Sequence, residues 1–568
     1  MQNGVRLTIL IVLIVPVLAG LAGIFLPGLG VFPLLGRSEI SADAFFELFA
    51  QPGIYHAICL SLWTGIAATI ISYLLAMTLL ACLFGAESNR WLFRLISPLL
   101  SVPHITVAIG LMFLLQPSGW LVRAVSPALT GWDRPPNLNI VPDEYGLMLI
   151  VGLIAKELPF FVLMGLSALS QIDVRGYLAS SAALGYGRLA GWFLVIQPLI
   201  ARRLRLSVLI VLVFSLSVVD MAIILAPNTP PPLSVMIFHW FQDPDLMKRF
   251  VGSAAAICQL GLIILCCAGW FALSHMIGKL VIWIVGKGWR LGSPRQFRRF
   301  LMAGLLVICL LPVCLAIAGM ASSLLWAFAD VWRFPDFLPQ KWGLGGWQVN
   351  SGLFATLVMN SLMLGLLASA LSMVMAICWL ELGSGHSPHS TAPNSVPAAG
   401  EFMIYLPLLV PQTAFLFGLQ ILLIMLKVDG VFISILWAHC LFVFPYIMLS
   451  LSEQWRQFDI RYDECAMVLG TDRWGRFWRV KLPILGVPIL ISFAIGFAVS
   501  AALYLPTIFA GLGRFQTLTT EAVLLASAAG RQTLGAAAFM QMLLPLTIFI
   551  VAEGLARVRY RRFSAFRL

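Results

Sequence analysis

Long apolar runs dominate this sequence and decide which folds it can adopt. Of its 568 residues, 60% are hydrophobic and only 11% carry a charge. A chain of this balance is expected to be solvated mainly by lipid, where a spanning helix needs about 20 mostly apolar residues. Because backbone groups in lipid must be satisfied within their own segment, the runs predict helices. We expect about twelve, at 7–26, 55–84, 95–115, 146–169, 205–226, 251–276, 300–323, 353–381, 403–426, 431–451, 485–508 and 538–556.

The sequence repeats itself at intervals of roughly half its length. A single match of this kind is weak evidence, but four matches in the same order indicate duplicated halves. The matched pairs are Ser61 and Gly65 with Ser361 and Gly365, Pro103 and Gly110 with Pro411 and Gly418, Pro159 and Asp173 with Pro445 and Asp459, and Gly185 and Pro198 with Gly470 and Pro483.

These observations predict an all-α polytopic membrane protein made of two six-helix repeats. The first half is expected over 1–276, a basic inner linker over 277–299 and the second half over 300–568. Both halves begin on the same side of the membrane, so the repeats are parallel. A second inner loop is expected at 383–399, which is rich in Ser, Pro, His and Gly.

Basic residues gather on one predicted side of the membrane. With the N-terminus placed inside, most of the 36 Lys and Arg residues fall in inner segments, which places both termini in the cytoplasm. The net charge of +12 therefore reports orientation, and we expect no nucleic-acid partner. The first apolar run has no clear cleavage site and is expected to be a retained helix. Neither the ten cysteines nor His386 and His389 are expected to bind metal.

Two basic inner loops, one after the fourth predicted span of each half, carry the most informative pattern. Each predicts a short helix of small residues, ended by a glycine that enters the left-handed conformation without steric cost. An amphipathic stretch follows, and a proline then opens the next membrane helix. Such helices suit a groove on another protein, although a plain basic loop could also fix topology. The residues concerned are Ala182, Leu184, Gly185 and Pro198, and Glu464, Ala466, Leu469, Gly470 and Pro483.

Both loops resemble the EAA loop, Glu-Ala-Ala-(three residues)-Gly-(about nine)-Ile-x-x-Pro, of type I ABC importer permeases with the MetI-like fold. The tandem halves are similar to the fused permeases of the iron(III) and thiamine importer group. In the second loop, Glu464 and Ala466 match the Glu and the final Ala of the motif, whereas Ala179 stands at the Glu place of the first loop. The first half therefore lacks the usual acidic contact.

The resemblance implies a permease subunit, not an enzyme, in a bacterial inner membrane. It implies that the first helix of each loop docks into a cleft on a cytosolic ATPase. Two loops in one chain then imply two copies of that subunit, besides a periplasmic solute-binding protein. The chain has no GxxxxGK[ST] loop, so ATP and Mg are expected on the partner ATPase and no cofactor in this chain.

Ionisable groups inside the predicted spans are candidates for lining a solute pathway, since they are costly in lipid. Asp220 shares a helical face with Ser217, and the equivalent span of the second half has Tyr504 but no acid. We expect Ser217, Asp220 and Tyr504 to line the pathway, unless Asp220 only bonds a neighbouring helix or lies close to the outer interface. Lys156 and Glu157 point in different directions, and an ion pair with a neighbouring helix is expected rather than solute contact.

Two further questions stay open at this point. The segments 228–237 and 516–521 are either outer gate helices or ordinary outer loops. An ion-coupled secondary transporter is the alternative function, disfavoured by the few acidic residues near the membrane midplane. The solute is not fixed by the sequence: thiamine, iron(III) and small organic ions are all compatible, and Asp220 weakly suggests a cationic or polar one.

Overall fold

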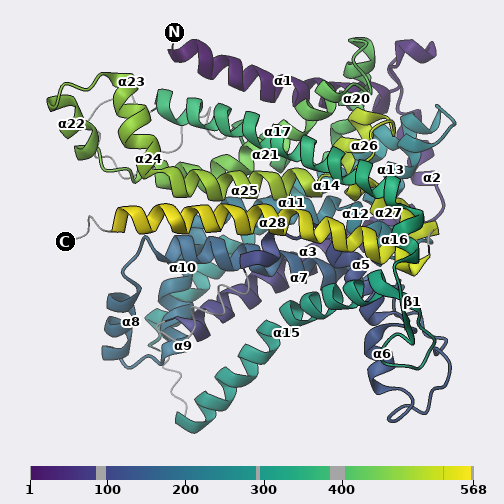
Figure 1. Cartoon of the computed structure of the whole chain (residues 1–568), viewed down its shortest axis with the longest axis horizontal. Coiled ribbons are helices and arrows are strands. Elements are labelled where there is room, and N and C mark those ends of the chain that lie inside the picture. The colour runs from purple at the N-terminus through teal and green to yellow at the C-terminus, as the bar shows by residue number, and fades with distance from the viewer. Residues whose placement is uncertain (1, 85–96, 289–294, 384–402, 529, 565–568) are drawn as a thin grey trace.

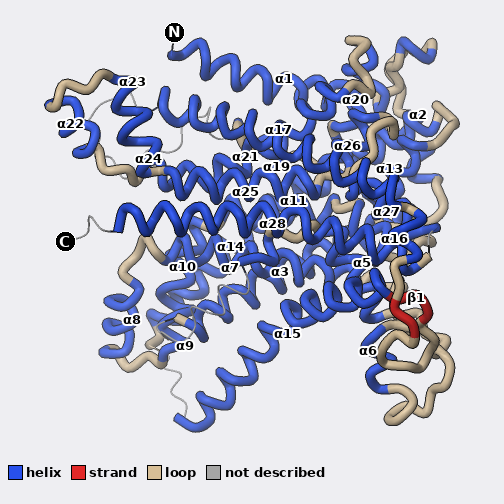
Figure 2. The backbone as a smooth tube through the Cα atoms, viewed as in Figure 1, coloured by secondary structure: helices blue, strands red, loops and turns tan. Residues whose placement is uncertain are grey.

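The chain folds into a long bundle of helices, most of which run along one axis (Figure 1). The computed structural model describes residues 2–84, 97–288, 295–383, 403–528 and 530–564. Within these ranges, Figure 2 shows the strands as a single short hairpin. Most of the predicted inner loop at 383–399, including His386 and His389, lies outside the described residues, as do 289–294 of the linker.

The elements follow the predicted repeat closely. The first half contains α1 (Gln2–Gly28), η1 (Pro33–Leu35), α2 (Asp43–Ala50), α3 (Ile54–Leu83), η3 (Ser97–Leu100), α5 (His104–Leu115), α6 (Trp120–Val125), α7 (Leu147–Leu169), α8 (Val174–Ala183), α9 (Arg188–Gly191), η4 (Trp192–Ile196), α10 (Gln197–Arg203), α11 (Arg205–Ser217), α12 (Asp220–Leu225), α13 (Leu233–Gln242) and α14 (Lys248–Gly286).

The second half adds one hairpin and one short helix after its first long helix. It contains α15 (Arg295–Phe328), β1 (Ala329–Val331), β2 (Lys341–Trp342), α16 (Gly345–Val349), α17 (Ser351–Gly383), α19 (Leu406–Leu409), η5 (Gln412–Ala414), α20 (Leu416–Met425), α21 (Phe432–Arg456), α22 (Arg461–Val468), α23 (Arg473–Arg476), η6 (Phe477–Lys481), α24 (Leu482–Ile484), α25 (Gly486–Ala502), α26 (Leu505–Gly511), α27 (Leu518–Ala528) and α28 (Arg531–Ser564). The strands β1 and β2 pair antiparallel.

The prediction of twelve continuous spans was wrong for the fifth span of the first half and for the third and fifth spans of the second. Among the described residues, nine helices are long and apolar enough to cross a membrane, or ten if the bent pair 473–484 and 486–502 forms one span. The predicted runs 205–226 and 403–426 are instead built from shorter helices. The all-helical polytopic fold class is confirmed, but the number of uninterrupted spanning helices was overestimated.

The breaks in the third spans are caused by proline. Pro103 precedes α5 with extended torsions, φ −61° and ψ 149°, and Pro411 precedes η5 with φ −54° and ψ 133°. A proline disfavours the helical conformation for the residue before it, so the helix stops there. Val410, which precedes Pro411, is accordingly extended.

The breaks in the fifth spans lie at extended residues within apolar sequence. Val218 after α11 has φ −62° and ψ 133°, and Leu503 after α25 has φ −72° and ψ 111°. The two short helices α12 and α26 follow these breaks. Hydropathy does not register these breaks, because the polar residues Ser217 and Asp220 or Ser500 and Thr507 are outnumbered by apolar neighbours in each run.

The first helix of each half packs against the other half. An added Cβ at Gly110 in α5 would lie 2.7 Å from the carbonyl carbon of Gly319 in α15. In the same way, Gly23 of α1 would meet the Cα of Gly418 in α20 at 2.6 Å. Helices come this close only where side chains are absent. The repeated glycines Gly110 and Gly418 thus fasten the two halves together.

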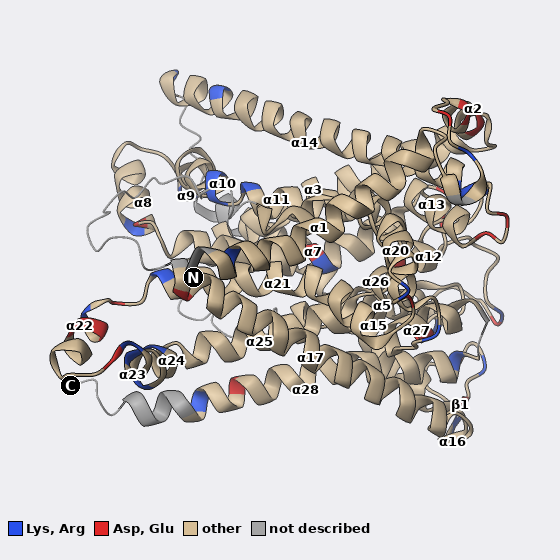
Figure 3. Cartoon of the chain, turned by 90° about the horizontal axis from the view of Figure 1, so that it is seen from above, with Lys and Arg blue, Asp and Glu red and all other residues tan. Residues whose placement is uncertain are grey.

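The two ends of the bundle carry different elements. Both termini lie at the end that bears α8, α9, α22 and α23 (Figure 1). The opposite end carries α2, α6, α13, α16 and the hairpin. Figure 3 shows basic residues on the loops of the first end together with some acidic ones, and charges of both signs at the opposite end as well.

Candidate functional site

Each predicted loop helix ends in the same glycine turn. In the first loop, Gly185 has φ +84°, its N–H donates to Ala182 O at 2.9 Å, and the N–H of Tyr186 donates to Ser181 O at 3.0 Å. This pair of bonds is the Schellman arrangement, which satisfies the last carbonyls of a helix. The predicted role of Gly185 as a left-handed terminator of α8 is confirmed.

The second loop reproduces that turn bond for bond. Gly470 has φ +80°, its N–H donates to Met467 O at 2.9 Å, and the N–H of Thr471 donates to Ala466 O at 3.1 Å. Asp472 then caps α23 by accepting from the N–H of Gly475 at 3.1 Å. Two turns of identical geometry at matched positions support the duplication inferred from sequence.

Each loop continues into a five-residue π-helical segment. These segments are η4 (Trp192–Ile196) and η6 (Phe477–Lys481), which follow their glycines at the same spacing. A π-helix is rare and is found frequently at functional sites. Its occurrence at the same place in both halves indicates a shared purpose rather than an accident of one sequence.

The prediction that proline opens the membrane helix was wrong in detail. Pro198 lies in the first turn of the short helix α10, and Pro483 in that of α24. The helices α11 and α25, which form the first parts of the fifth spans, begin only later. The axis of 473–484 is bent by 71° from that of α25, so this part of the loop forms an elbow.

The two loops are held together by different forces. In the second, Arg476 Nε lies 3.1 Å from Asp463 Oδ1, and Lys481 Nζ lies 2.6 Å from Glu381 Oε2 on α17. At the places of Arg476 and Lys481 the first loop has Gly191 and Ile196, both buried. The first loop is therefore held by packing and by hydrogen bonds from Arg188 to the carbonyls of Ala81 and Phe84, whereas the second loop has ion pairs.

Both loop helices expose small or apolar side chains beyond the bundle. Leu184 is 63% exposed, Leu469 is 84% exposed and Val468 is 84% exposed. Ala182 and Glu464 are also exposed, whereas Ala466 is buried. Apolar side chains in such positions mark surfaces that another protein covers.

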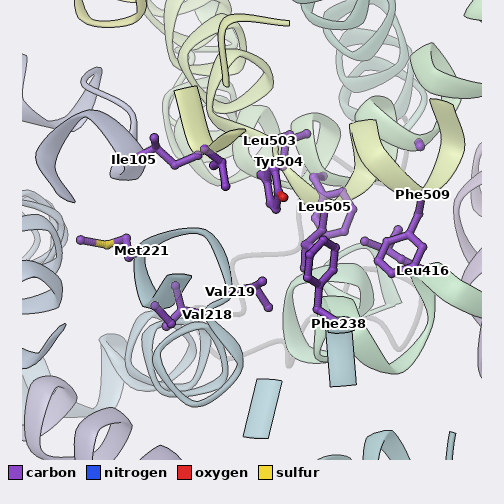
Figure 4. Packing of buried hydrophobic residues seen from close by; sticks show 14 of the residues in the cluster. Ile105, Val218, Val219, Met221, Phe238, Leu416, Leu503, Tyr504, Leu505 and Phe509 are labelled. Atoms are coloured by element: carbon purple, nitrogen blue, oxygen red, sulfur yellow. The ribbon is translucent and has the colours of Figure 1, made fainter. Parts of the chain in front are cut away.

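A cavity lies between the two halves, at the breaks of both fifth spans. It offers about 110 Å³ to water-sized molecules, and Ser217, Asp220 and Tyr504 all line it. Figure 4 shows Val218 and Val219 of the first half opposite Leu503, Tyr504 and Leu505 of the second. The structure thus brings together the three residues that the sequence singled out.

The other ionisable groups of this region have partners of their own. Lys156 donates to the carbonyls of Leu99 and Leu100, each at 3.0 Å, and to that of Val102. Glu157 instead lies 3.5 Å from Nε2 of His104 on the neighbouring α5. The expected separation of Lys156 from Glu157 is confirmed, but Lys156 binds backbone carbonyls rather than an opposite charge.

His439 is a buried residue of this region that the sequence did not reveal. Its Nδ1 lies 2.8 Å from Ser500 Oγ on α25, and its Nε2 lies 2.9 Å from Thr507 Oγ1 on α26. Thr507 donates its own proton to Leu503 O at 2.8 Å, so it accepts from His439. The neutral imidazole thereby spans the break at Leu503 beside the cavity. A single histidine within an apolar run gave no signal of this role.

The repeated serines of the second spans hold the segments after each fifth span. Ser61 Oγ accepts from the N–H of Leu233, the first residue of α13, at 2.8 Å. Ser361 Oγ accepts from the N–H of Leu518, the first residue of α27, at 2.9 Å. The two regions left open as gate helices or loops therefore contain the first turns of α13 and α27. In each half, the serine of the second span accepts a hydrogen bond from the first residue of that helix.

Known proteins resemble the chain along most of its length. It is 31% identical over 515 residues to the inner membrane ABC transporter permease protein YnjC of Escherichia coli K12, covering 90% of each chain. It is 22% identical to the thiamine transport system permease protein ThiP of Salmonella typhimurium, covering 90% of this chain and 91% of that one. ThiP of Escherichia coli K12 is also 22% identical, over 80% of each chain.

No protein-family model matches the chain. The relatives nevertheless cover both halves, and they favour the permease over the ion-coupled transporter that the sequence left open. Among the described residues, no group of three or more His, Cys, Asp or Glu side chains is placed to hold a metal ion. With 31% identity over nine-tenths of its length, the chain belongs to the ABC transporter permeases.

Proposed function

We propose that this chain forms the whole membrane pathway of an ABC importer and couples it to two cytosolic ATPase subunits. The observation that carries the proposal is the pair of matched loops at one end of the bundle, with the same glycine turn and the same π-helical segment. Two docking helices in one chain call for two ATPase subunits. ATP and Mg would be bound by those subunits.

The loops also give the chain its orientation. It is a multi-pass protein of the inner membrane, and we place the end with α8 and α22 in the cytoplasm together with both termini. The basic residues of that end agree with this placement. A solute-binding protein would then deliver its ligand at the opposite end, near α13 and α27.

The cavity is the proposed translocation pathway. It is lined by residues of both halves, including Ser217, Asp220 and Tyr504, and it lies where the fifth spans are broken. Broken helices at membrane depth are found where backbone lines a cavity or is buried in protein. Movement of the loops by ATP would reach the cavity through α11 and α25, which connect the two sites.

ATP hydrolysis by the purified complex in lipid nanodiscs tests the coupling. The variant G185V/G470V places β-branched residues at two left-handed positions, where only glycine is comfortable. We expect binding of the ATPase and stimulated hydrolysis to fall at least tenfold. Unchanged transport that does not need the ATPase would contradict the proposal.

The chain offers a matched control for backbone strain. Gly36 and Gly513 also have positive φ, at +74° and +72°, with open space around an added Cβ, but they lie after α1 and α26 at the other end. The variant G36V/G513V therefore carries similar strain away from the loops. We expect it to retain ATPase binding, and an equal loss in both double variants would mean that general misfolding explains the result.

A further inference from the structure

The cavity contains one buried carboxyl group. Among the described residues that line it, Asp220, which is 9% exposed, is the only acid, and none is Lys or Arg. Among the described residues no Lys, Arg or His side chain lies within ion-pair distance of it, and the N–H of Met221 donates to its Oδ1 at 2.9 Å. A buried charge of this kind is costly unless a partner meets it.

The imidazole of His104 also lines the cavity, but it makes its closest charged contact elsewhere. Its Nε2 lies 3.5 Å from the carboxylate of Glu157, outside the cavity lining. A protonated His104 would therefore be balanced by Glu157, and a neutral one leaves the region more negative. With His104 balanced in this way or neutral, an ionised Asp220 would be the one charge left unbalanced among the described lining residues, and it would attract a cation.

Aromatic rings make up much of the remaining wall. Phe214, Phe442, Tyr446 and Tyr504 line the cavity, and the His104 ring lies 4.7 Å from that of Phe214. The face of an aromatic ring attracts a cation within about 6 Å, and such rings recognise quaternary ammonium groups. The wall is thus suited to a cation that carries apolar substituents.

The donor set argues against a bare metal ion. No cluster of three or more His, Cys, Asp or Glu residues occurs within the described part of the chain. Ser217, which faces the cavity, has its hydroxyl proton committed to Val213 O at 2.7 Å. The position in the second half that corresponds to Asp220 is Leu505, so a single charge is available.

We propose that this cavity selects a small organic monocation, with Asp220 as its counter-charge and Phe214, Phe442, Tyr446 and Tyr504 around its apolar part. The inference rests on the proposed translocation pathway and names its substrate class. The proposal places the charge-selecting residue at the break in the first half. The second half contributes three of the four aromatic side chains. The remaining charged residues of the bundle take no part in recognition.

Binding of choline and of its uncharged carbon isostere, 3,3-dimethyl-1-butanol, separates charge from shape. Both would be titrated into the complete permease–ATPase complex in nanodiscs, by isothermal calorimetry or competition with labelled choline. We expect choline to bind at least tenfold more tightly than the isostere. The variant D220N is expected to remove this preference, and D220E to keep most of it.

A buried acid outside the cavity provides the control. Asp143, which precedes α7, is 8% exposed and does not line the cavity, so D143N removes a buried carboxylate without touching the proposed site. We expect D143N to leave the choline preference within twofold of wild type. Equal binding of choline and its isostere by the wild type, or an unchanged preference in D220N, would overturn the inference.

The same preparation distinguishes failure of this inference from failure of the proposed function. ATP hydrolysis that depends on Gly185 and Gly470, without any preference for choline, would overturn the cation site and leave the importer intact. Loss of both the coupling and the binding preference in the wild type would overturn the proposed function itself.

Discussion

The hydrogen bonds of His439 form a directed chain across a helix break. Ser500 donates to Nδ1, Nε2 donates to Thr507, and Thr507 donates to the carbonyl of Leu503. At the equivalent places the first half has Leu153, Ser215 and Ala222, which cannot form this chain. The second-half break is therefore held by polar bonds that the first-half break lacks.

Replacing His439 by leucine is expected to destabilise the protein by about 1–3 kcal/mol, because it leaves buried hydroxyls without their partner. The thermal unfolding midpoint in nanodiscs should fall accordingly. His275 on α14 is exposed, so H275L is the control and should leave the midpoint unchanged. An unchanged midpoint in H439L would show that the chain of bonds is not stabilising.

Asp220, Ser217 and Tyr504 show how far single residues could be predicted. Their placement around one cavity followed from two ideas, that charges in spans are costly and that the halves are equivalent. Their neighbours His104, Phe442 and Tyr446 could not be predicted, because they come from other helices and only the packing brings them there. The free-energy cost of placing an ionisable residue in lipid can be judged from the sequence, but the residues that pack around it cannot.

The glycine contact between α1 and α20 depends on the absence of side chains. A Cβ at Gly418 would clash with the carbonyl of Gly20. The variant G418A is expected to cost about 1–3 kcal/mol, since two helix backbones must separate. A fall in the thermal unfolding midpoint checks this expectation.

The helix α14 supplies the matched substitution. Gly261 has open space where its Cβ would lie, so G261A adds the same methyl group without a clash. We expect it to be neutral or to stabilise by up to about 1 kcal/mol, because alanine favours helix over glycine. If G418A and G261A behave alike, the close approach of α1 and α20 contributes nothing to stability.

The asymmetry of the loop helices leads to a further expectation. Glu464 on α22 is exposed, whereas Ala179 stands at the corresponding place on α8. If the acid contacts the ATPase, E464K should reduce stimulated ATP hydrolysis several-fold more than A179E changes it. Hydrolysis rates with the cognate ATPase measure both variants, and equal effects would argue against an acidic contact at the second loop.

The helices themselves were predicted well where apolar length decided the outcome. The spans expected at 55–84 and 146–169 became α3 and α7 with nearly the same bounds. The elbow between α24 and α25 was not foreseen, because proline is equally suited to the first turn of a short or a long helix. Where the chain bends is decided by packing against neighbouring helices.

The two halves of the molecule share a repeated backbone but differ in key side chains. The backbone repeats its breaks, glycine turns and π-helical segments, while the side chains differ at Asp220, His439 and the loop ion pairs. The crossing of α1 and α15 onto the opposite halves was not predictable, because the repeat indicates equivalent elements but not which half each one packs against. The duplication thus accounts for the shared backbone, whereas the side chains that differ between the halves account for their different chemistry.

The mass of the intact complex tests most directly whether one chain binds two ATPase subunits through its two loops. Native mass spectrometry of the complex assembled with the cognate ATPase is expected to show two ATPase subunits per permease chain. The G185V/G470V variant should carry none, while G36V/G513V keeps two. A wild-type complex with a single ATPase subunit, or two subunits retained by G185V/G470V, would contradict the account.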